Sequence, residues 1–235
     1  MIQYLGDTAI SVRLSNEIAP DLINRVHGID LALGELGIEG IVETIPTYNG
    51  ITIFLDPVKA KLIEIEAALI RLVNDEDFEA PIGKCWEVPV AYGGRFGPDL
   101  GDVAKYASIN ALDVKKLHLS RVYTVAMLGF LPGFSYLLGL NPKISMPRRA
   151  TPRTKISSSS ISIGGQQTAI GSVEGPSGWH IIGRTPVRPF QLGRSCEFLF
   201  RPGDRIKFRE ITQDEWFELD DQASRGNMVA EVLET

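Results

Sequence analysis

The run Tyr123-Thr124-Val125-Ala126-Met127-Leu128-Gly129-Phe130-Leu131-Pro132-Gly133-Phe134-Ser135-Tyr136-Leu137 passes from an apolar stretch into a loop of glycine, proline and aromatic residues. Its first half, residues 123–128, has the length and composition of a β-strand. In its second half glycine frees the backbone and proline fixes it, so that aromatic side chains can be held on a shaped loop. The run therefore predicts a strand that ends in a functional loop.

More short strands are expected after this run, each bounded by glycine or proline, at residues 161–163, 167–170, 179–183, 197–200 and 205–210. Such spacing is typical of a β-barrel or sandwich whose long loops carry the site. Two short helices are expected before the run, one capped by Asp99 and one that Asn110 caps and that ends near His118. A closing helix or tail is expected from Trp216.

The first eighty residues have a different pattern. A strand at 9–14 precedes a helix with an apolar stripe and a stop at Gly37, and two strands around Asn49-Gly50 form a hairpin. A second helix follows, and the two stripes comprise Leu22, Val26, Ile29, Leu33 and Leu36 in the first helix and Leu62, Ile65, Leu69 and Leu72 in the second. We predict an α+β protein with a small α/β sandwich at 1–83 and a β-barrel domain at 84–235, with the linker in the stretch that follows Asn74.

Charge is segregated along the chain. Residues 114–173 hold eight of the 24 lysines and arginines and none of the 29 aspartates and glutamates. Arg148, Arg149 and Arg153 lie on a proline-bounded loop, and Arg184 follows Gly183 near a strand end. We expect both segments to bind one carboxylate or phosphate, since rigid placement favours recognition by arginine. The alternative is that these arginines are solvated surface charges.

The composition excludes several classes of protein. A net charge of −5 and a pI near 5.3 are unlike those of a general nucleic-acid binder. Cys85 and Cys196 fit neither a disulfide framework nor a metal motif, so we expect both to be buried, and no metal site. The N-terminus lacks the features of a signal peptide and no stretch is typical of a membrane span, so we expect a cytoplasmic protein.

Three histidines are candidates for acid–base chemistry. His27 is expected to be an ordinary helix residue, and His180 is a weak candidate beside Trp179. His118 is either the catalytic acid or base or a helix C-terminal residue favoured by the dipole. The nucleophile motifs of common hydrolases are absent from the sequence, which argues against a self-contained hydrolase.

The run 123–137, together with Pro147-Arg148-Arg149, Thr151-Pro152-Arg153, Gly165-Gln166-Gln167-Thr168 and Gly183-Arg184-Thr185-Pro186, resembles the family of the 5-oxoprolinase B subunit. That family is also known as allophanate hydrolase subunit 1 or the Kip-type histidine-kinase inhibitor. The resemblance covers essentially the whole chain. The sequence departs from the family pattern at Ile156-Ser157-Ser158-Ser159, at Ala169-Ile170-Gly171-Ser172 and at Ser177.

The resemblance implies a cyclophilin-like barrel and an enzyme that opens 5-oxoproline to glutamate with ATP and its Mg counter-ion. It implies a composite site shared with the C and A subunits of that enzyme. Gln167 and Thr185 join the four arginines as implied substrate-binding residues, and the site-shaping residues are Gly129, Phe130, Pro132, Gly133, Phe134, Tyr136 and Trp179. Two other functions stay open: inhibition of a histidine kinase without chemistry, and one half of a urea or allophanate carboxyltransferase.

Overall fold

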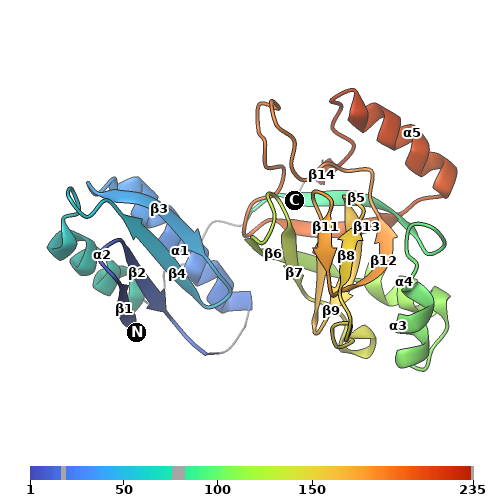
Figure 1. The fold of residues 1–235 in the computed structure, drawn as a ribbon, viewed down its shortest axis with the longest axis horizontal. Helices are drawn as coiled ribbons and strands as arrows, with labels where there is room; N and C mark the ends of the chain where they lie inside the picture. Colours follow the sequence, from blue (N-terminus) through green and yellow to red (C-terminus); the bar gives the residue numbers. More distant parts are fainter. Residues whose placement is uncertain (17–19, 76–82, 234–235) are drawn as a thin grey trace. The chain divides into compact units, whose positions relative to one another are not determined.

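The computed structural model describes residues 1–16, 20–75 and 83–233. The chain divides into two compact units, Met1–Ile82 and Gly83–Thr235. Most of the predicted linker lies outside the described residues. The predicted architecture, a small α/β sandwich followed by a β-barrel, is confirmed (Figure 1).

The first unit contains an antiparallel sheet in the order β1-β2-β4-β3. Its strands are β1 (Ile2–Leu5), β2 (Ala9–Arg13), β3 (Ile41–Pro46) and β4 (Gly50–Leu55). The predicted hairpin is β3–β4, and the amide of Thr47 closes its turn on the carbonyl of Gly50 at 2.8 Å. Strand β1 is not predicted from the sequence, because its exposed side chains give no alternating pattern.

Helices α1 (Pro20–Leu36) and α2 (Leu62–Asn74) lie on one face of this sheet (Figure 1). Their apolar stripes are buried in a core with the strands. The buried stripe of α1 runs through Ile23, Val26, Ile29 and Leu33. The prediction that Leu36 belongs to the buried stripe is wrong, since this side chain is 43% exposed. Leu62, the first residue of the stripe predicted for α2, is also exposed. The middle of each predicted stripe is confirmed.

The second unit is a closed barrel. The strand order β12-β9-β10-β7-β6-β13-β5 closes on itself through the pairing of β12 with β5. Closure removes the free strand edges. The strands are β5 (Cys85–Tyr92), β6 (Val122–Leu128), β7 (Ser135–Leu138), β9 (Ser160–Gly164), β10 (Gln167–Ile170), β12 (His180–Arg184) and β13 (Arg205–Glu210).

The core of the barrel is aliphatic, and its fully buried side chains include Val88, Val90, Val125, Leu137, Ile161, Ile163, Ile182 and Ile206. Burying each such side chain contributes about 1.5 to 3 kcal/mol. The remaining elements are α3 (Leu100–Tyr106), α4 (Ala111–Leu119), η1 (Pro142–Ile144), the two-stranded ribbon of β8 (Arg153–Ile156) and β11 (Gly175–Ser177), α5 (Gln213–Ser224) and β14 (Glu231–Leu233).

The strand predicted at 197–200 does not form. The segment has an isolated bridge between Phe190 and Phe198 and two backbone hydrogen bonds, from Gln191 to Glu197 at 3.0 Å and from Leu199 to Pro189 at 2.8 Å. The guanidinium of Arg194 also donates to the carbonyls of Cys196 and Glu197, at 2.7 and 3.1 Å. Cys196 is exposed, which corrects the expectation that both cysteines are buried, while Cys85 is buried as expected. None of the helices in the described part of the chain is long and apolar enough to cross a membrane.

Candidate functional site: two pockets around a buried carboxylate

The loop after β5, residues 93–99, crosses closely over strand β12. Gly93 lies at φ +68°, and a Cβ on Gly97 would come within 1.9 Å of the carbonyl oxygen of Ile182. The amide of Asp99 donates to the carbonyl of Ile181 at 2.9 Å. Only glycine permits this approach at position 97, and the loop thereby carries Arg95 and Asp99 to the side of the barrel.

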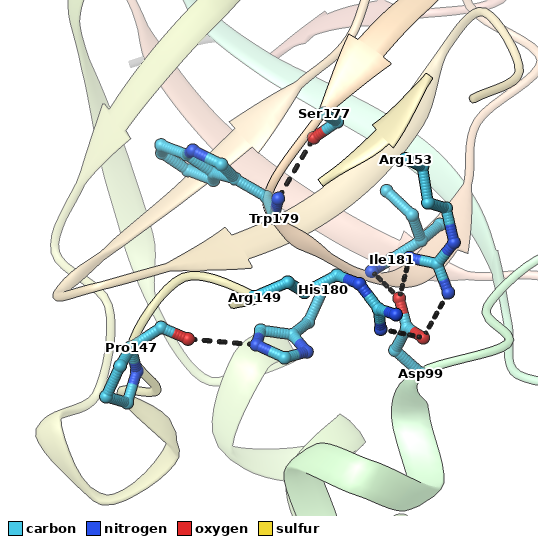
Figure 2. Close-up of polar contacts among 8 residues, drawn as sticks. All are labelled: Asp99, Pro147, Arg149, Arg153, Ser177, Trp179, His180 and Ile181. Carbon is cyan, nitrogen blue, oxygen red and sulfur yellow. Dashed lines mark hydrogen bonds and ion pairs between the residues drawn. The ribbon is translucent and has the colours of Figure 1, made fainter. Parts of the chain in front are cut away.

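The carboxylate of Asp99 accepts four hydrogen bonds from three residues (Figure 2). Arg153 binds it with both terminal nitrogens, at 2.7 and 2.6 Å, and Arg149 binds at 3.3 Å. The amide of Ile181 donates to the same carboxylate at 2.7 Å. Asp99 is 2% exposed. Two of the predicted anion-binding arginines therefore already hold an anion that belongs to the chain.

Burial by itself raises the pKa of the Asp99 carboxyl, but the hydrogen bonds from Arg153 and Ile181 and the charges of both arginines outweigh it and hold the pKa below its ordinary value. The sequence predicts Asp99 as a helix cap. It does precede α3, yet its side chain makes no capping hydrogen bond. The guanidinium groups are stronger partners for a carboxylate than a backbone amide is.

A first hollow, which we call the cationic pocket, lies on one side of this cluster and has a volume of about 280 Å³. Four cationic side chains line it and no acidic one does; they are Arg95, Arg153, Lys155 and Arg184. The rest of its wall is Phe96, Pro98, Ile156, Ser157, Ser160 and Ile181. Arg95 and Lys155 are not among the predicted site residues, although Arg95 follows the Gly93-Gly94 pair that marks the loop.

Helix α5 holds two of these cations in place. The guanidinium of Arg184 lies 4.8 Å from the ring centroid of Trp216, and that of Arg95 lies 5.2 Å from the ring of Phe217. Arg184 also donates through Nε to the carbonyl of Ser158 at 2.9 Å. Stacking on aromatic faces positions a guanidinium without neutralising it.

A second hollow, the aromatic pocket, has a volume of about 360 Å³. Its walls include four aromatic side chains and two arginines: Phe130, Phe134, Tyr136, Trp179, Arg148 and Arg149. The guanidinium of Arg148 lies 5.5 Å from the Trp179 ring centroid. In Figure 2 the Trp179 ring points away from the Asp99 carboxylate. The pocket suits a small, partly apolar molecule that carries a negative charge.

The predicted loop at 129–134 shapes this pocket. Phe130 has a φ of +69°, an uncommon conformation for a non-glycine residue, and its side chain is 63% exposed at the pocket wall. Gly133 has a φ of +73°, and a Cβ there would meet Phe190 at 2.7 Å. Gly133 thus contributes through its backbone, and Phe130 and Phe134 line the pocket. Gly129 and Pro132 belong to the same loop but do not line the pocket.

The structure divides the predicted anion site. Arg148 and Arg149 line the aromatic pocket, whereas Arg153 and Arg184 line the cationic pocket. The other two implied binding residues line neither. Gln167 begins strand β10, and Thr185 is fully buried, where its hydroxyl accepts from the amide of Val187 at 3.1 Å. Thr185 is therefore buried and lines neither pocket.

His118 lies in the barrel core. Its side chain is 0% exposed and stacks on Phe208 at 4.7 Å. Nδ1 lies 2.8 Å from the hydroxyl of Tyr92, and Nε2 lies 3.0 Å from Oγ1 of Thr168. Helix α4 thereby ties several strands together. The ring has no exposed surface in this structure, so its geometry favours a structural role over the predicted catalytic one.

The hydrogen bonds also assign the tautomer of His118. Oγ1 of Thr168 donates to the carbonyl of Ser162 at 2.9 Å, so it accepts from Nε2. Nδ1 then accepts from Tyr92. Burial lowers the pKa of His118 from 6.5 to about 3. His118 does lie in the last turn of α4, as the predicted alternative has it, but this lowered pKa disfavours the charged ring that the helix dipole would stabilise.

This pKa predicts a loss of stability in mild acid. Below pH 6.5 the unfolded chain binds a proton at His118 that the folded chain does not bind until about pH 3. The free energy of unfolding should therefore fall with decreasing pH by up to about 1.4 kcal/mol per pH unit from this group. Urea unfolding between pH 7 and pH 5 measures the effect. In the His118→Gln variant the free energy of unfolding should depend less steeply on pH, because one fewer proton is taken up on unfolding. A ¹⁵N spectrum in which the folded ring titrates near pH 6.5 would contradict it.

The other two histidines are also buried. His27 lies on α1, as expected, and Nε2 of His180 lies 2.9 Å from the carbonyl oxygen of Pro147, as Figure 2 shows. Among residues 1–16, 20–75 and 83–233, no group of three or more histidine, cysteine, aspartate or glutamate side chains is placed to hold a metal ion.

Known proteins resemble the chain over most of its length. A family model described as carboxyltransferase domain, subdomain C and D, matches residues 1–200. A Bacillus subtilis (strain 168) protein, named as the B subunit of 5-oxoprolinase, is 33% identical, and the alignment covers 92% of this chain and 94% of that protein. The protein of the same name from Escherichia coli O157:H7 is 34% identical over 87% of this chain and 93% of its own length.

A solved structure has the same fold. The crystal structure of TTHA0988 superposes with a TM-score of 0.77 at 28% identity and covers 90% of this chain. The match spans only 40% of the TTHA0988 chain.

Proposed function

The chain belongs to the family of the carboxyltransferase domain, subdomains C and D, and from this premise we propose that it is the B subunit of an ATP-dependent 5-oxoprolinase that opens 5-oxoproline to glutamate. The observation that carries the proposal is the aromatic pocket with Arg148 at its wall. 5-Oxoproline is a five-membered lactam with one carboxylate. Aromatic walls suit its ring, and an arginine suits its carboxylate.

The pocket binds substrate but lacks a general base of its own. Its lining residues include no histidine, lysine, cysteine, aspartate or glutamate. Burial raises the pKa of Tyr136, and the charge of Arg148 only partly opposes this, so the phenol stays protonated near neutral pH. Groups for proton transfer therefore come from partners, for which we propose the A and C subunits of the enzyme.

ATP supplies the activation of the lactam carbonyl, whose amide resonance makes direct attack by water slow. The four cationic side chains of the cationic pocket suit a phosphate group, and this supports a role for ATP in the proposed reaction. This chain's own contribution is to bind and orient. Trp179 and Phe134 exclude water from the lactam ring, and Arg148 fixes its carboxylate.

The first test is reconstitution. We expect the isolated chain to neither open 5-oxoproline nor hydrolyse ATP, and we expect glutamate to form when candidate A and C subunits are added with ATP and Mg. Arg148→Lys keeps the charge but loses the planar fork, so kcat/KM for 5-oxoproline should fall about tenfold to a hundredfold in the complex.

The matched control is Arg121→Lys, because Arg121 is an exposed arginine of the same acid-free stretch that lines neither pocket. Turnover of the complex should be unchanged in that variant. Robust turnover by the isolated chain, or equal kcat/KM in the Arg148→Lys complex, would overturn the proposal.

A further inference from the structure

The charges around the cationic pocket do not balance. Arg153 is paired with Asp99, and Lys155 is paired with Glu174 at 2.7 Å. Within the described part of the chain, neither Arg95 nor Arg184 forms a salt bridge with a carboxylate. Asp220, whose charge acts on Arg184, forms its salt bridge with Arg188 instead. Two positive charges therefore remain at the pocket.

These two charges are held in position before any ligand arrives. Arg184 is fixed by Trp216 and by two contacts to Ser158, through the carbonyl at 2.9 Å and the hydroxyl at 3.3 Å. Arg95 lies against Phe96 and Phe217. Fixed guanidinium groups lose little freedom when they bind an anion, and a pocket with charges of one sign concentrates the opposite charge.

We propose that the cationic pocket is a phosphate-binding site of this chain, in which Arg95 and Arg184 bind a dianionic phosphate group while Asp99 holds Arg153 at its edge. The two uncompensated charges match a phosphate, which carries about −1.5 to −2 at neutral pH, better than a carboxylate, which carries −1. The phosphate is free in solution or is the terminal group of a nucleotide. The site is separate from the aromatic pocket, and the inference deepens the proposed function, in which this pocket suits a phosphate group of ATP.

The protonation behaviour of Arg184 agrees with this charge count. Burial lowers its pKa, Asp220 opposes that effect, and Arg188 and Arg95 lower the pKa further. A bound anion would relieve this repulsion.

Calorimetric titration of the full-length isolated chain tests the proposal. The probes are inorganic phosphate, pyrophosphate, ATP and acetate at constant ionic strength. We expect pyrophosphate to bind at least tenfold more tightly than acetate, and its affinity to fall with added salt. Tighter binding of ATP than of pyrophosphate identifies a nucleotide as the source, and equal binding identifies free phosphate or pyrophosphate.

Substitutions locate the bound anion. Arg184→Gln and Arg95→Gln should each weaken pyrophosphate binding by about tenfold or more, whereas Arg225→Gln should leave it unchanged, since Arg225 is an exposed arginine that lines neither pocket. Arg95 is exposed, so its variant remains informative even where Arg184→Gln disturbs folding. Equal affinity for acetate, or binding lost in Arg148→Gln and kept in Arg95→Gln, refutes the assignment. Because no turnover is measured, an inactive reconstituted complex would leave this result standing.

Discussion

Replacing Asp99 with alanine is expected to lower the free energy of unfolding by about 3 to 5 kcal/mol, the cost of removing one partner from a buried ion pair. The substitution leaves Arg153 without its two short hydrogen bonds and leaves the buried amide of Ile181 without an acceptor side chain. It also frees Arg149 at the edge of the aromatic pocket. Urea unfolding followed by tryptophan fluorescence measures the loss.

Two further variants separate charge from shape. Asp99→Asn keeps the size of the side chain. We expect it to be nearly as damaging, because an amide has one acceptor oxygen and no negative charge, so it cannot form the paired ionic hydrogen bonds to Arg153. Asp102→Asn makes the same change at an exposed position of α3 and should change stability by less than about 0.5 kcal/mol. If Asp99→Ala unfolds at the same urea concentration as Asp102→Asn, the carboxylate is not what joins the loop to the ribbon.

Asp99 also shows why the sequence could not reveal the site. Its position before an apolar helix is the local signature of a cap, and that signature is correct for Asn110, whose side chain accepts from the amide of Asp113 at 2.8 Å. The partners of Asp99 are 50, 54 and 82 residues away along the chain. The local sequence pattern carries no information about such distant pairing. It therefore predicts Asp99 as a helix cap and Arg149 and Arg153 as ligand-binding residues, and does not predict that they pair with one another.

The fold is predictable where burial follows a regular period. Strands β9, β10, β12 and β13 and the two helices of the first unit are predicted from apolar spacing and are confirmed. Strands β7, β8 and β11 are not predicted, because they are three or four residues long and contain serine, arginine or proline at positions that an alternating pattern needs to be apolar. The start of the β8 strand separates the two pockets, since Pro152 lines the aromatic pocket and Arg153 lines the cationic one.

The same reasoning explains the division of the predicted anion site. Arg148, Arg149 and Arg153 are close in sequence, but the chain enters strand β8 at Arg153, so Arg149 and Arg153 line different pockets. The departure from the family pattern at 156–159 falls on the cationic pocket: Ile156 and Ser157 line it, and the hydroxyl of Ser158 binds Arg184. This chain's own residues therefore set the orientation of a cation that we expect to bind phosphate.

A second large loss of stability is expected from a substitution in the core of the first unit. Val26 is 0% exposed on α1 and packs in a core with Ile10, Ile53 and Leu69. Val26→Asp would bury a carboxylate without a counter-charge, and we expect it to cost on the order of 4 kcal/mol or more. Because the core of this unit shares no residue with the core of the barrel, the damage should stay local. Hydrogen exchange should show lost protection in α1 and strands β2 and β4, with protection kept in β6 and β13.

The matched control is Val58→Asp, the same chemical change at a side chain that is 90% exposed in the same unit. It should leave both the melting transition and the exchange pattern as they are in the parent, since an exposed carboxylate keeps its hydration. The comparison isolates burial from charge: both variants make the net charge more negative by one, and only one of them removes the carboxylate from water. Equal melting of the two variants would mean that the stripe from Ile23 to Leu33 does not face the sheet, and the prediction from helical spacing would then be wrong at its most buried position.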